Sequence, residues 1–338
     1  MNEIIQTLQI GNVPDPEETP DLKAEWLRKL KIAARSAHGL KDVELPRREP
    51  IVGKWLMQGD LGFIYGSRGL GKTWLGLHLA RQIGEGGAVA FWPVHKPRRV
   101  LYVDGEMPFD DIRQRDAGLT GAEADGLFYL QHEALFHLTE SVLNLAIPAV
   151  QEALLDLCKD QGIEVLVLDN LSCLFSGVNE NDAADWEKVL PWLLALRRAR
   201  ITVIFIAHAG RNGLMRGTSR REDAAFWIIR LDEVKEPDAT AQGAKFIARF
   251  VKERNKSDEP CPPLEWQFKK PGEDGRIGVS WKKLSPTDML RQCVEDGLTS
   301  AIDIAAELEI SKGMVSRLAT RAMKEGWLKK DGRDYALV

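Results

Sequence analysis

Residues 61–73 have the sequence LGFIYGSRGLGKT, an apolar run followed directly by a glycine-rich loop and a lysine. Residues 61–65 are typical of a buried strand, and residues 66–73 fit the pattern G-x-x-x-x-G-K-[ST] ahead of a helical segment. Glycines let backbone N–H groups turn inward around phosphates, and the N-terminus of the following helix adds a positive dipole end. This order of strand, motif and helix predicts a nucleoside triphosphate site rather than a chance glycine-rich turn.

Two cofactors, ATP and Mg²⁺, follow from this motif and from a second apolar run. Lys72 is expected to reach the β- and γ-phosphates, and the Thr73 hydroxyl to bind Mg²⁺. Asp169 ends the run VLVLD (165–169) and is expected to hold the Mg²⁺ shell, the alternative being a helix cap. The residues expected to bind the nucleotide are Gly66, Ser67, Arg68, Gly69, Leu70, Gly71, Lys72, Thr73 and Trp74.

Short apolar runs alternate with helical segments on both sides of the motif. The alternation predicts a doubly wound α/β domain with a mostly parallel sheet, in which ligands collect at the C-terminal ends of the strands. Strands are predicted at residues 61–65, 100–104, 165–169 and 201–207, with a further apolar strand at 245–251. Helices are predicted at residues 72–83, 147–159 and 186–199.

Composition limits the class of protein. The chain is 44% hydrophobic and 28% charged, as soluble globular proteins are, and its net charge of -4 argues against nucleic-acid binding by bulk positive charge. It has no run of eighteen apolar residues and no secretory signal pattern, so a cytoplasmic protein without a membrane partner is expected. Its four cysteines have no metal-binding spacing, so ordinary free thiols are expected.

Three parts are expected along the chain: an N-terminal helical and linker segment (1–48), an ATPase domain (49–283) and a small C-terminal domain (284–338). The first contains a predicted helix at 22–37, and its partner is left open. The last has predicted helices at 287–295, 300–308 and 311–324, with two strands around Asp331-Gly332. It resembles a winged helix-turn-helix.

The C-terminal part carries a local excess of positive charge. From Ser311 onward it has seven lysines and arginines against three acidic residues, so 7 - 3 = +4. This excess favours phosphate contacts, here with duplex DNA, although many winged helices bind proteins instead. The expected DNA-binding residues are Lys312, Arg317 and Arg321.

Two further residues follow predicted strands at the expected ligand edge. Glu106 comes two residues after the strand 100–104, which is expected to lie beside the strand that leads into the phosphate loop. A carboxylate there can orient the water that attacks the γ-phosphate; the alternative is a surface carboxylate. His208 ends the strand 201–207. A histidine in this position is either a phosphate sensor or a structural residue.

The order of Glu106, Asp169 and His208 resembles that in the RepA-like and DnaB-type hexameric helicases, which are RecA-like P-loop ATPases of the AAA_25 type. The resemblance covers about residues 50–270. It implies that Glu106 polarises the attacking water and that His208 senses the γ-phosphate. In the AAA+ enzymes, the glutamate that polarises the water usually follows directly after the Mg²⁺-binding aspartate. In this chain that aspartate is Asp169, and Asn170 follows it.

The resemblance also implies contacts with single-stranded DNA. The glycine-rich, basic segment 209–223 corresponds to a loop that faces the central channel of the ring. Such a loop needs positive charge and flexibility to follow a phosphate backbone; the alternative is a solvated connector. Its arginines are Arg211, Arg216, Arg220 and Arg221.

An arginine acting between subunits is implied by residues 252–255 (KERN), which look like the K-x-R-N signature of the DnaB type. Lys252 and Arg254 would then enter the ATP site of the neighbouring subunit. In RepA the arginine that acts between subunits (the arginine finger) lies earlier in the chain. The corresponding residues here, 224–227, contain no arginine. Arg254 is therefore the first choice, Arg216 and Arg230 are the alternatives, and a charged strand end without this role remains open.

The function implied is an ATP-driven, homo-hexameric DNA helicase or translocase that serves replication of a plasmid, phage or integrated element. Two alternatives stay open. One is an ATP-switched initiator, partition factor or transcription regulator that binds duplex DNA. The other is a RecA-like recombination mediator.

Overall fold

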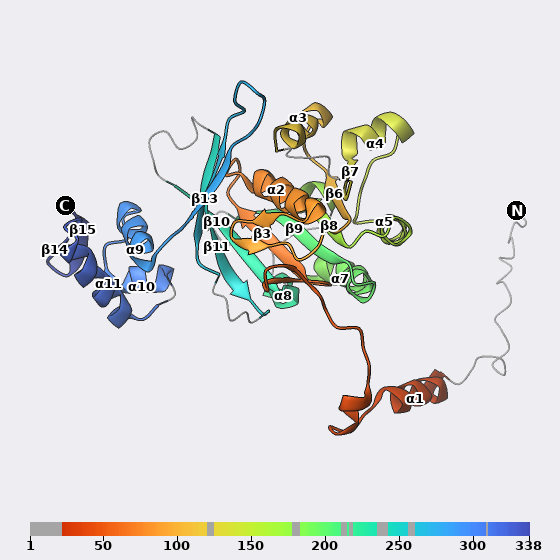
Figure 1. The fold of residues 1–338 in the computed structure, drawn as a ribbon. Coiled ribbons are helices and arrows are strands. Elements are labelled where there is room, and N and C mark those ends of the chain that lie inside the picture. The colour runs from red at the N-terminus through yellow and green to blue at the C-terminus, as the bar shows by residue number, and fades with distance from the viewer. Residues whose placement is uncertain are drawn as a thin grey trace, which may run out of the picture. The chain divides into compact units, whose positions relative to one another are not determined.

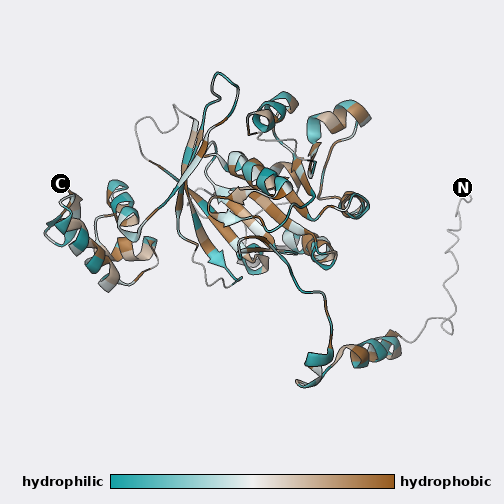
Figure 2. Cartoon of the chain, in the orientation of Figure 1, coloured by the Kyte–Doolittle hydropathy of each residue, from teal (hydrophilic) through white to brown (hydrophobic). Residues whose placement is uncertain are grey.

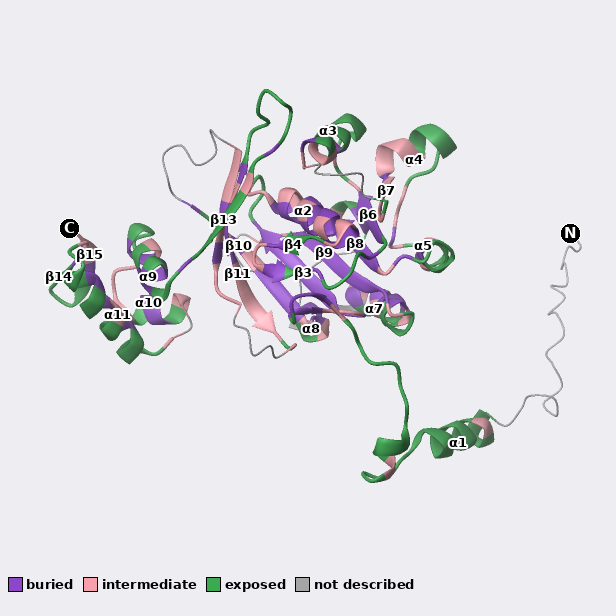
Figure 3. Ribbon diagram, in the orientation of Figure 1, coloured by how far each residue is buried: buried purple, intermediate pink, exposed green. Residues whose placement is uncertain are grey.

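The computed structural model describes residues 22–119, 125–177, 183–210, 215, 219–234, 243–255, 261–308 and 310–338. The chain divides into two compact units, Met1–Arg47 and Arg48–Val338 (Figure 1). In the first unit, α1 (Leu22–Ala33) and the short helix η1 (Gly39–Asp42) contain no buried residue (Figure 3). The helix predicted at residues 22–37 is confirmed from Leu22 to Ala33. Its Trp26 side chain is 53% exposed.

A nine-stranded mixed sheet forms the centre of the second unit. The strands from β10 through β7 run parallel, and β11, β12 and β13 continue the sheet beyond β10, each antiparallel to its neighbour. The order across the sheet is β13 (Val279–Lys283), β12 (Leu264–Lys269), β11 (Gly243–Glu253), β10 (Trp227–Glu233), β3 (Leu61–Gly66), β9 (Thr202–His208), β8 (Val165–Asp169), β6 (Val100–Asp104) and β7 (Leu127–Gln131).

The four strands predicted in the parallel part are confirmed as β3, β6, β8 and β9. Every residue of β3, β6 and β8 is buried, because helices cover both faces of this part of the sheet. Figure 2 shows the corresponding band of hydrophobic residues through the middle of the domain. One expectation is wrong: β6 does not pair with β3, since β9 and β8 lie between them.

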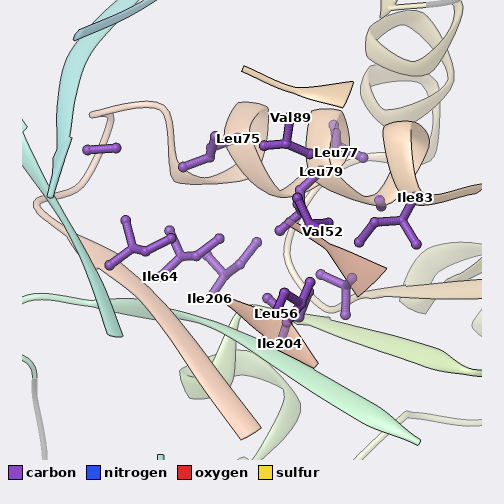
Figure 4. Packing of buried hydrophobic residues seen from close by; sticks show 14 of the residues in the cluster. Val52, Leu56, Ile64, Leu75, Leu77, Leu79, Ile83, Val89, Ile204 and Ile206 are labelled. Atoms are coloured by element: carbon purple, nitrogen blue, oxygen red, sulfur yellow. The ribbon is translucent and has the colours of Figure 1, made fainter. Parts of the chain in front are cut away.

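Helix α2 (Lys72–Glu85) packs on one face of the sheet. Its Leu75 and Leu79 lie in one cluster with Ile64 of β3 and Ile206 of β9, all at most 4% exposed (Figure 4). Full burial of one such side chain stabilises a fold by about 1.5–3 kcal/mol. This packing fixes the start of α2, and with it the phosphate loop, against the strand ends. Four short strands join this side: β1 (Pro50–Val52), β2 (Leu56–Met57), β4 (Ala88–Val89) and β5 (Trp92–Pro93).

The opposite face is covered by α5 (Pro148–Asp160) and α7 (Ala183–Arg198), close to the bounds predicted for them. Leu154 of α5 and Leu196 of α7 share a cluster with Phe63 and Phe205 of the sheet. Alternate residues of β3 thus point to opposite layers, as the period of a strand requires. The remaining helices of this region are α3 (Phe109–Leu119), α4 (His132–Thr139), α6 (Leu171–Leu174) and α8 (Ser219–Ala224).

The C-terminal part has three helices and a β-hairpin around a small core of its own. Each helix begins at a serine whose side chain accepts a backbone N–H three residues later: Ser285, Ser300 and Ser311. Glu307 joins this part to the sheet through ion pairs with Arg230 (2.6 Å) and Arg249 (3.5 Å). The elements are α9 (Pro286–Glu295), α10 (Ala301–Glu307), α11 (Lys312–Lys324), β14 (Leu328–Asp331) and β15 (Asp334–Leu337).

Within the described ranges, none of the helices has the length and apolar character needed to cross a membrane.

Candidate active site

The loop between β3 and α2 has a backbone conformation that favours glycine at two positions. Gly69 has φ +74° and Gly71 has φ +104°. A Cβ on Gly71 would lie 2.7 Å from the Phe246 ring, whereas the space around Gly69 is open. Lys72 starts α2, is 6% exposed, and donates from Nζ to the Ser67 carbonyl at 2.7 Å. Burial lowers the pKa of Lys72, and the charges of Asp169 and Glu106 oppose this shift.

Two buried carboxylates lie side by side where β6 and β8 end. Asp104 pairs with Asp169 in the register of the sheet, and they are 1% and 3% exposed. Asp169 accepts from the Tyr102 hydroxyl at 2.7 Å, and a hydrogen bond from Thr73 helps to lower its pKa against the larger raising effect of burial. Burial, together with the charge of Asp169, raises the pKa of Asp104 to about 7.

These carboxylates fit a divalent cation. Oδ2 of Asp104 is buried and makes no hydrogen bond within the described part of the chain. Two adjacent buried carboxylates are costly without a positive charge, and oxygen atoms are the ligands that Mg²⁺ prefers. Thr73 and Asp169 are the residues that would hold the ion, and Asp104 is a neighbouring carboxylate that was not predicted to belong to the site. Its signal was its place at the end of a predicted strand.

Glu106, His208 and Asn170 form a second group next to the carboxylates. Asp104 Oδ1 accepts the backbone N–H groups of Glu106 (3.2 Å) and Met107 (2.8 Å), which fixes the turn after β6. The Glu106 side chain is 56% exposed and accepts a hydrogen bond from Asn170 Nδ2. The same Nδ2 lies 3.3 Å from His208 Nε2, and His208 Nε2 lies 3.9 Å from Glu106 Oε2. Glu106 thus reaches the site although two strands separate β6 from β3.

A cavity of about 640 Å³ joins the phosphate loop to both groups. Its size is that of a small-molecule ligand site. Predicted residues in its wall include Lys72, Thr73, Glu106, Asp169 and His208. Further lining residues come from β11, β12 and the two residues after β12, which were not predicted to belong to the site: Gly243, Ala244, Phe268, Lys269, Lys270 and Pro271.

Trp74 lies in the same wall, between an aromatic and a cationic neighbour. Its ring stacks on Phe268 with centroids 6.1 Å apart, and the Arg115 guanidinium lies 4.7 Å from its centroid. Arg68 and Arg115 add positive charge to the cavity wall. Such a wall suits a polyanion, because cations and backbone N–H groups surround the space.

Lys252 and Arg254 lie at the other end of the strands. Glu253 of β11 pairs with Trp227 of β10, and Trp227 pairs with Gly62 near the start of β3. The phosphate loop begins at Gly66, the last residue of β3, four residues or roughly 13 Å along the strand from Gly62. Arg254 lines a different cavity of about 390 Å³, with Asp60, Arg197 and Phe226. Neither residue can therefore act on the phosphate loop of its own chain.

The other arginines assigned by the sequence analysis have different outcomes. Arg211 and Arg216, and the side chain of Arg220, lie outside the described residues. The assignment of Arg221 to DNA is wrong for this structure: it is 1% exposed, and its guanidinium lies over the Trp186 ring at 4.6 Å. Arg230, an alternative finger, pairs with Asp232 and Glu307 of its own chain at 2.8 and 2.6 Å.

The three basic residues assigned on the C-terminal part are exposed on α11. Lys312 and Arg317 lie on its surface, and Arg321 pairs with Glu325 one turn later at 2.9 Å. They are accessible to a phosphate backbone.

Comparisons with known proteins show the family to which the chain is similar. Residues 27–213, more than half of the chain, match the family model AAA_25, described as an AAA domain. The DNA repair protein RadA of Campylobacter jejuni is 26% identical over 235 residues, which are 63% of this chain and 47% of that protein. The chain thus spans about half the length of this relative.

Two solved structures are also similar. The KaiC-like protein PH0186 of Pyrococcus horikoshii has a TM-score of 0.47 and 16% identity, over 67% of this chain and 91% of that one. The flagellar accessory protein FlaH of Methanocaldococcus jannaschii has a TM-score of 0.45 and 15% identity, over 66% of this chain and 90% of that one.

Proposed function

Because the chain belongs to the AAA domain family AAA_25, we propose that it is a Mg²⁺-dependent, RecA-like ATPase that works as a DNA translocase or helicase. One observation carries the ATPase part of the proposal. The phosphate loop, the buried Asp169, Glu106 and His208 come from four separate strand ends and line one cavity. That is the set of groups needed to bind a triphosphate and align water for attack on it.

Each side chain has a defined part in the proposed reaction. Lys72 exchanges its bond to the Ser67 carbonyl for the β- and γ-phosphates, while the N–H groups of the loop hold the remaining oxygens. Glu106, whose backbone is fixed by Asp104, orients the attacking water. Mg²⁺, held by Thr73 and Asp169, would supply charge neutralisation at the phosphate oxygens.

The translocase part of the proposal rests on the positions of basic residues. Arg254 lies too far from its own phosphate loop to act there, so a role in ATP hydrolysis requires the site of a second copy. We therefore propose a closed ring of like subunits, a hexamer as in the helicases that the sequence resembles. The arginines of segment 209–223, other than Arg221, would face single-stranded DNA in its channel.

The ATPase rate with and without single-stranded DNA tests this proposal, together with strand separation of a forked duplex. Electron microscopy with a non-hydrolysable ATP analogue shows the assembly directly. A closed ring and DNA-stimulated turnover are expected. Turnover that ignores single-stranded DNA, with no strand separation, would leave an ATPase and remove the helicase.

A second function is favoured by the C-terminal part. Its three helices and hairpin have the element order of a winged helix-turn-helix, and α11 exposes Lys312 and Arg317. The chain would then be an ATP-switched protein that binds duplex DNA. ATP-dependent binding to one duplex sequence, lost on charge removal at α11, would support this function. Filaments and strand exchange would instead support a recombination mediator.

A further inference from the structure

Asn170 lies between Glu106 and His208, the two residues proposed above to act on the γ-phosphate. It directly follows β8, and β8 lies between β6, which leads to Glu106, and β9, which ends at His208. Asn170 is 1% exposed. A buried amide must satisfy its donors and its acceptor within the protein, so the partners of both ends of this side chain are informative.

The direction of the Asn170 amide is fixed by the helix that follows it. Its Oδ1 accepts the Cys173 backbone N–H at 3.0 Å, as the N-cap of α6. A backbone N–H can only donate, so the oxygen end must face Cys173. The NH₂ end then faces the active site.

The two hydrogens of that NH₂ group have two acceptors. Nδ2 donates to Glu106 Oε2 and lies 3.3 Å from His208 Nε2. Since Nδ2 has no lone pair to offer, His208 Nε2 must be the accepting nitrogen in this arrangement. One buried amide thus ties the half-exposed Glu106 to His208.

We propose that Asn170 is a positioning residue that orients Glu106 for attack on ATP and couples that orientation to His208. The inference rests on the proposed ATPase activity. A displacement of the His208 ring would change its contact with Nδ2, while the Cys173 N–H continues to hold the oxygen end of the amide. Without the amide, the Glu106 carboxylate loses this tie to His208.

Substitutions at position 170 that keep the cap test the role of the NH₂ group. Asn170→Asp keeps the shape and the acceptor for Cys173 but has no N–H, and Asn170→Ser is an uncharged side chain that also caps helices. We expect both to lower kcat by about tenfold to a hundredfold, the effect of losing a hydrogen bond to a charged group. The Kd of a fluorescent ATP analogue should stay within about threefold of that of the wild type, because the phosphate loop is untouched.

Asn144 offers the matched control. Its side chain also accepts a backbone N–H, from Ala146 at 2.9 Å, and donates to a carbonyl, that of Ser176 at 3.1 Å, but it does not line the cavity. Asn144→Asp and Asn144→Ser should leave kcat unchanged. In a Glu106→Gln background, Asn170→Ser should lower the residual rate by less than about twofold, because its effect passes through the Glu106 carboxylate.

The outcomes separate this inference from the proposed function. A wild-type protein without ATPase activity would overturn the proposed function and, with it, this role. If the wild type hydrolyses ATP and the variants at position 170 have the same or a higher kcat, only the role of Asn170 is overturned. Loss of nucleotide affinity in parallel with kcat, or full additivity with Glu106→Gln, would also overturn it by showing a structural role.

Discussion

Alanine substitutions at Gly69 and Gly71 should separate two costs of closing the phosphate loop. Both glycines have positive φ, so a Cβ at either position strains the backbone by about 1–2 kcal/mol. Only at Gly71 does the new Cβ also collide with Phe246, at 2.7 Å, and overpacking of this kind costs about 1–3 kcal/mol more. Gly71→Ala should therefore cost about 2–5 kcal/mol in total, and Gly69→Ala about 1–2 kcal/mol.

The cost of each substitution can be measured in two places. If the unliganded loop relaxes away from Phe246, the cost is recovered when nucleotide binds, and Gly71→Ala weakens ATP binding by about 5- to 150-fold more than Gly69→Ala. If the loop stays in place, the same difference lowers the free energy of unfolding. Titration with a fluorescent ATP analogue measures the loss of ATP affinity, and urea unfolding measures the loss of unfolding free energy.

A second substitution identifies the collision as the cause. Phe246→Leu removes the ring that the new Cβ would meet, so Gly71→Ala added to Phe246→Leu should cost about as much as Gly69→Ala costs in the wild type. Equal ATP affinity and equal unfolding free energy for the two alanine variants would refute the packing described for this loop.

Three further variants address the chemistry and the assembly. Glu106→Gln should bind ATP normally but turn over about 10²- to 10⁴-fold more slowly in a steady-state phosphate-release assay; normal turnover would mean that another group orients the water. Arg254→Ala should assemble but hydrolyse ATP poorly, and mixing it with Lys72→Ala should restore some activity; no rescue in mixed assemblies would argue against a site shared between copies. Burial raises the pKa of Asp60 from 3.8 to about 6, so the stability that its protonated form provides below pH 4 is lost as pH rises through 6, by about 3 kcal/mol. The difference in unfolding free energy between the wild type and Asp60→Asn, measured with urea, should change between pH 4 and pH 6. A difference that does not vary with pH would contradict the raised pKa of Asp60.

The parallel part of the sheet could be predicted because its strands are continuous apolar runs that are buried on both faces. The run at 61–65 predicts β3 whatever lies beside it. Its neighbours could not be ranked in this way, since pairing joins residues far apart in the chain. This is why β6 was expected beside β3, and why β7, β10, β12 and β13 were not assigned at all.

The candidate site could be predicted where its residues belong to a sequence motif. It could not be predicted where the role of a residue depends on the direction of its side chain. Lys72 and Glu106 stand at strand ends that the sequence marks. Arg221 belongs to a basic run, and only the position of Trp186 shows that it points inward. Asn170 was seen as the residue that replaces a glutamate, but its contacts depend on β8 lying between β6 and β9.

Strand β11 connects three regions that sequence places in separate motifs. Its first residues, Gly243 and Ala244, border the nucleotide cavity, Arg249 near its middle binds Glu307 of the C-terminal part, and Arg254 follows its last residue. This strand pairs with β10 on one side and β12 on the other, and its 11 residues span roughly 36 Å. A ligand that displaces the start of this strand would therefore act on the same element that carries the contact with Glu307 and leads to Arg254.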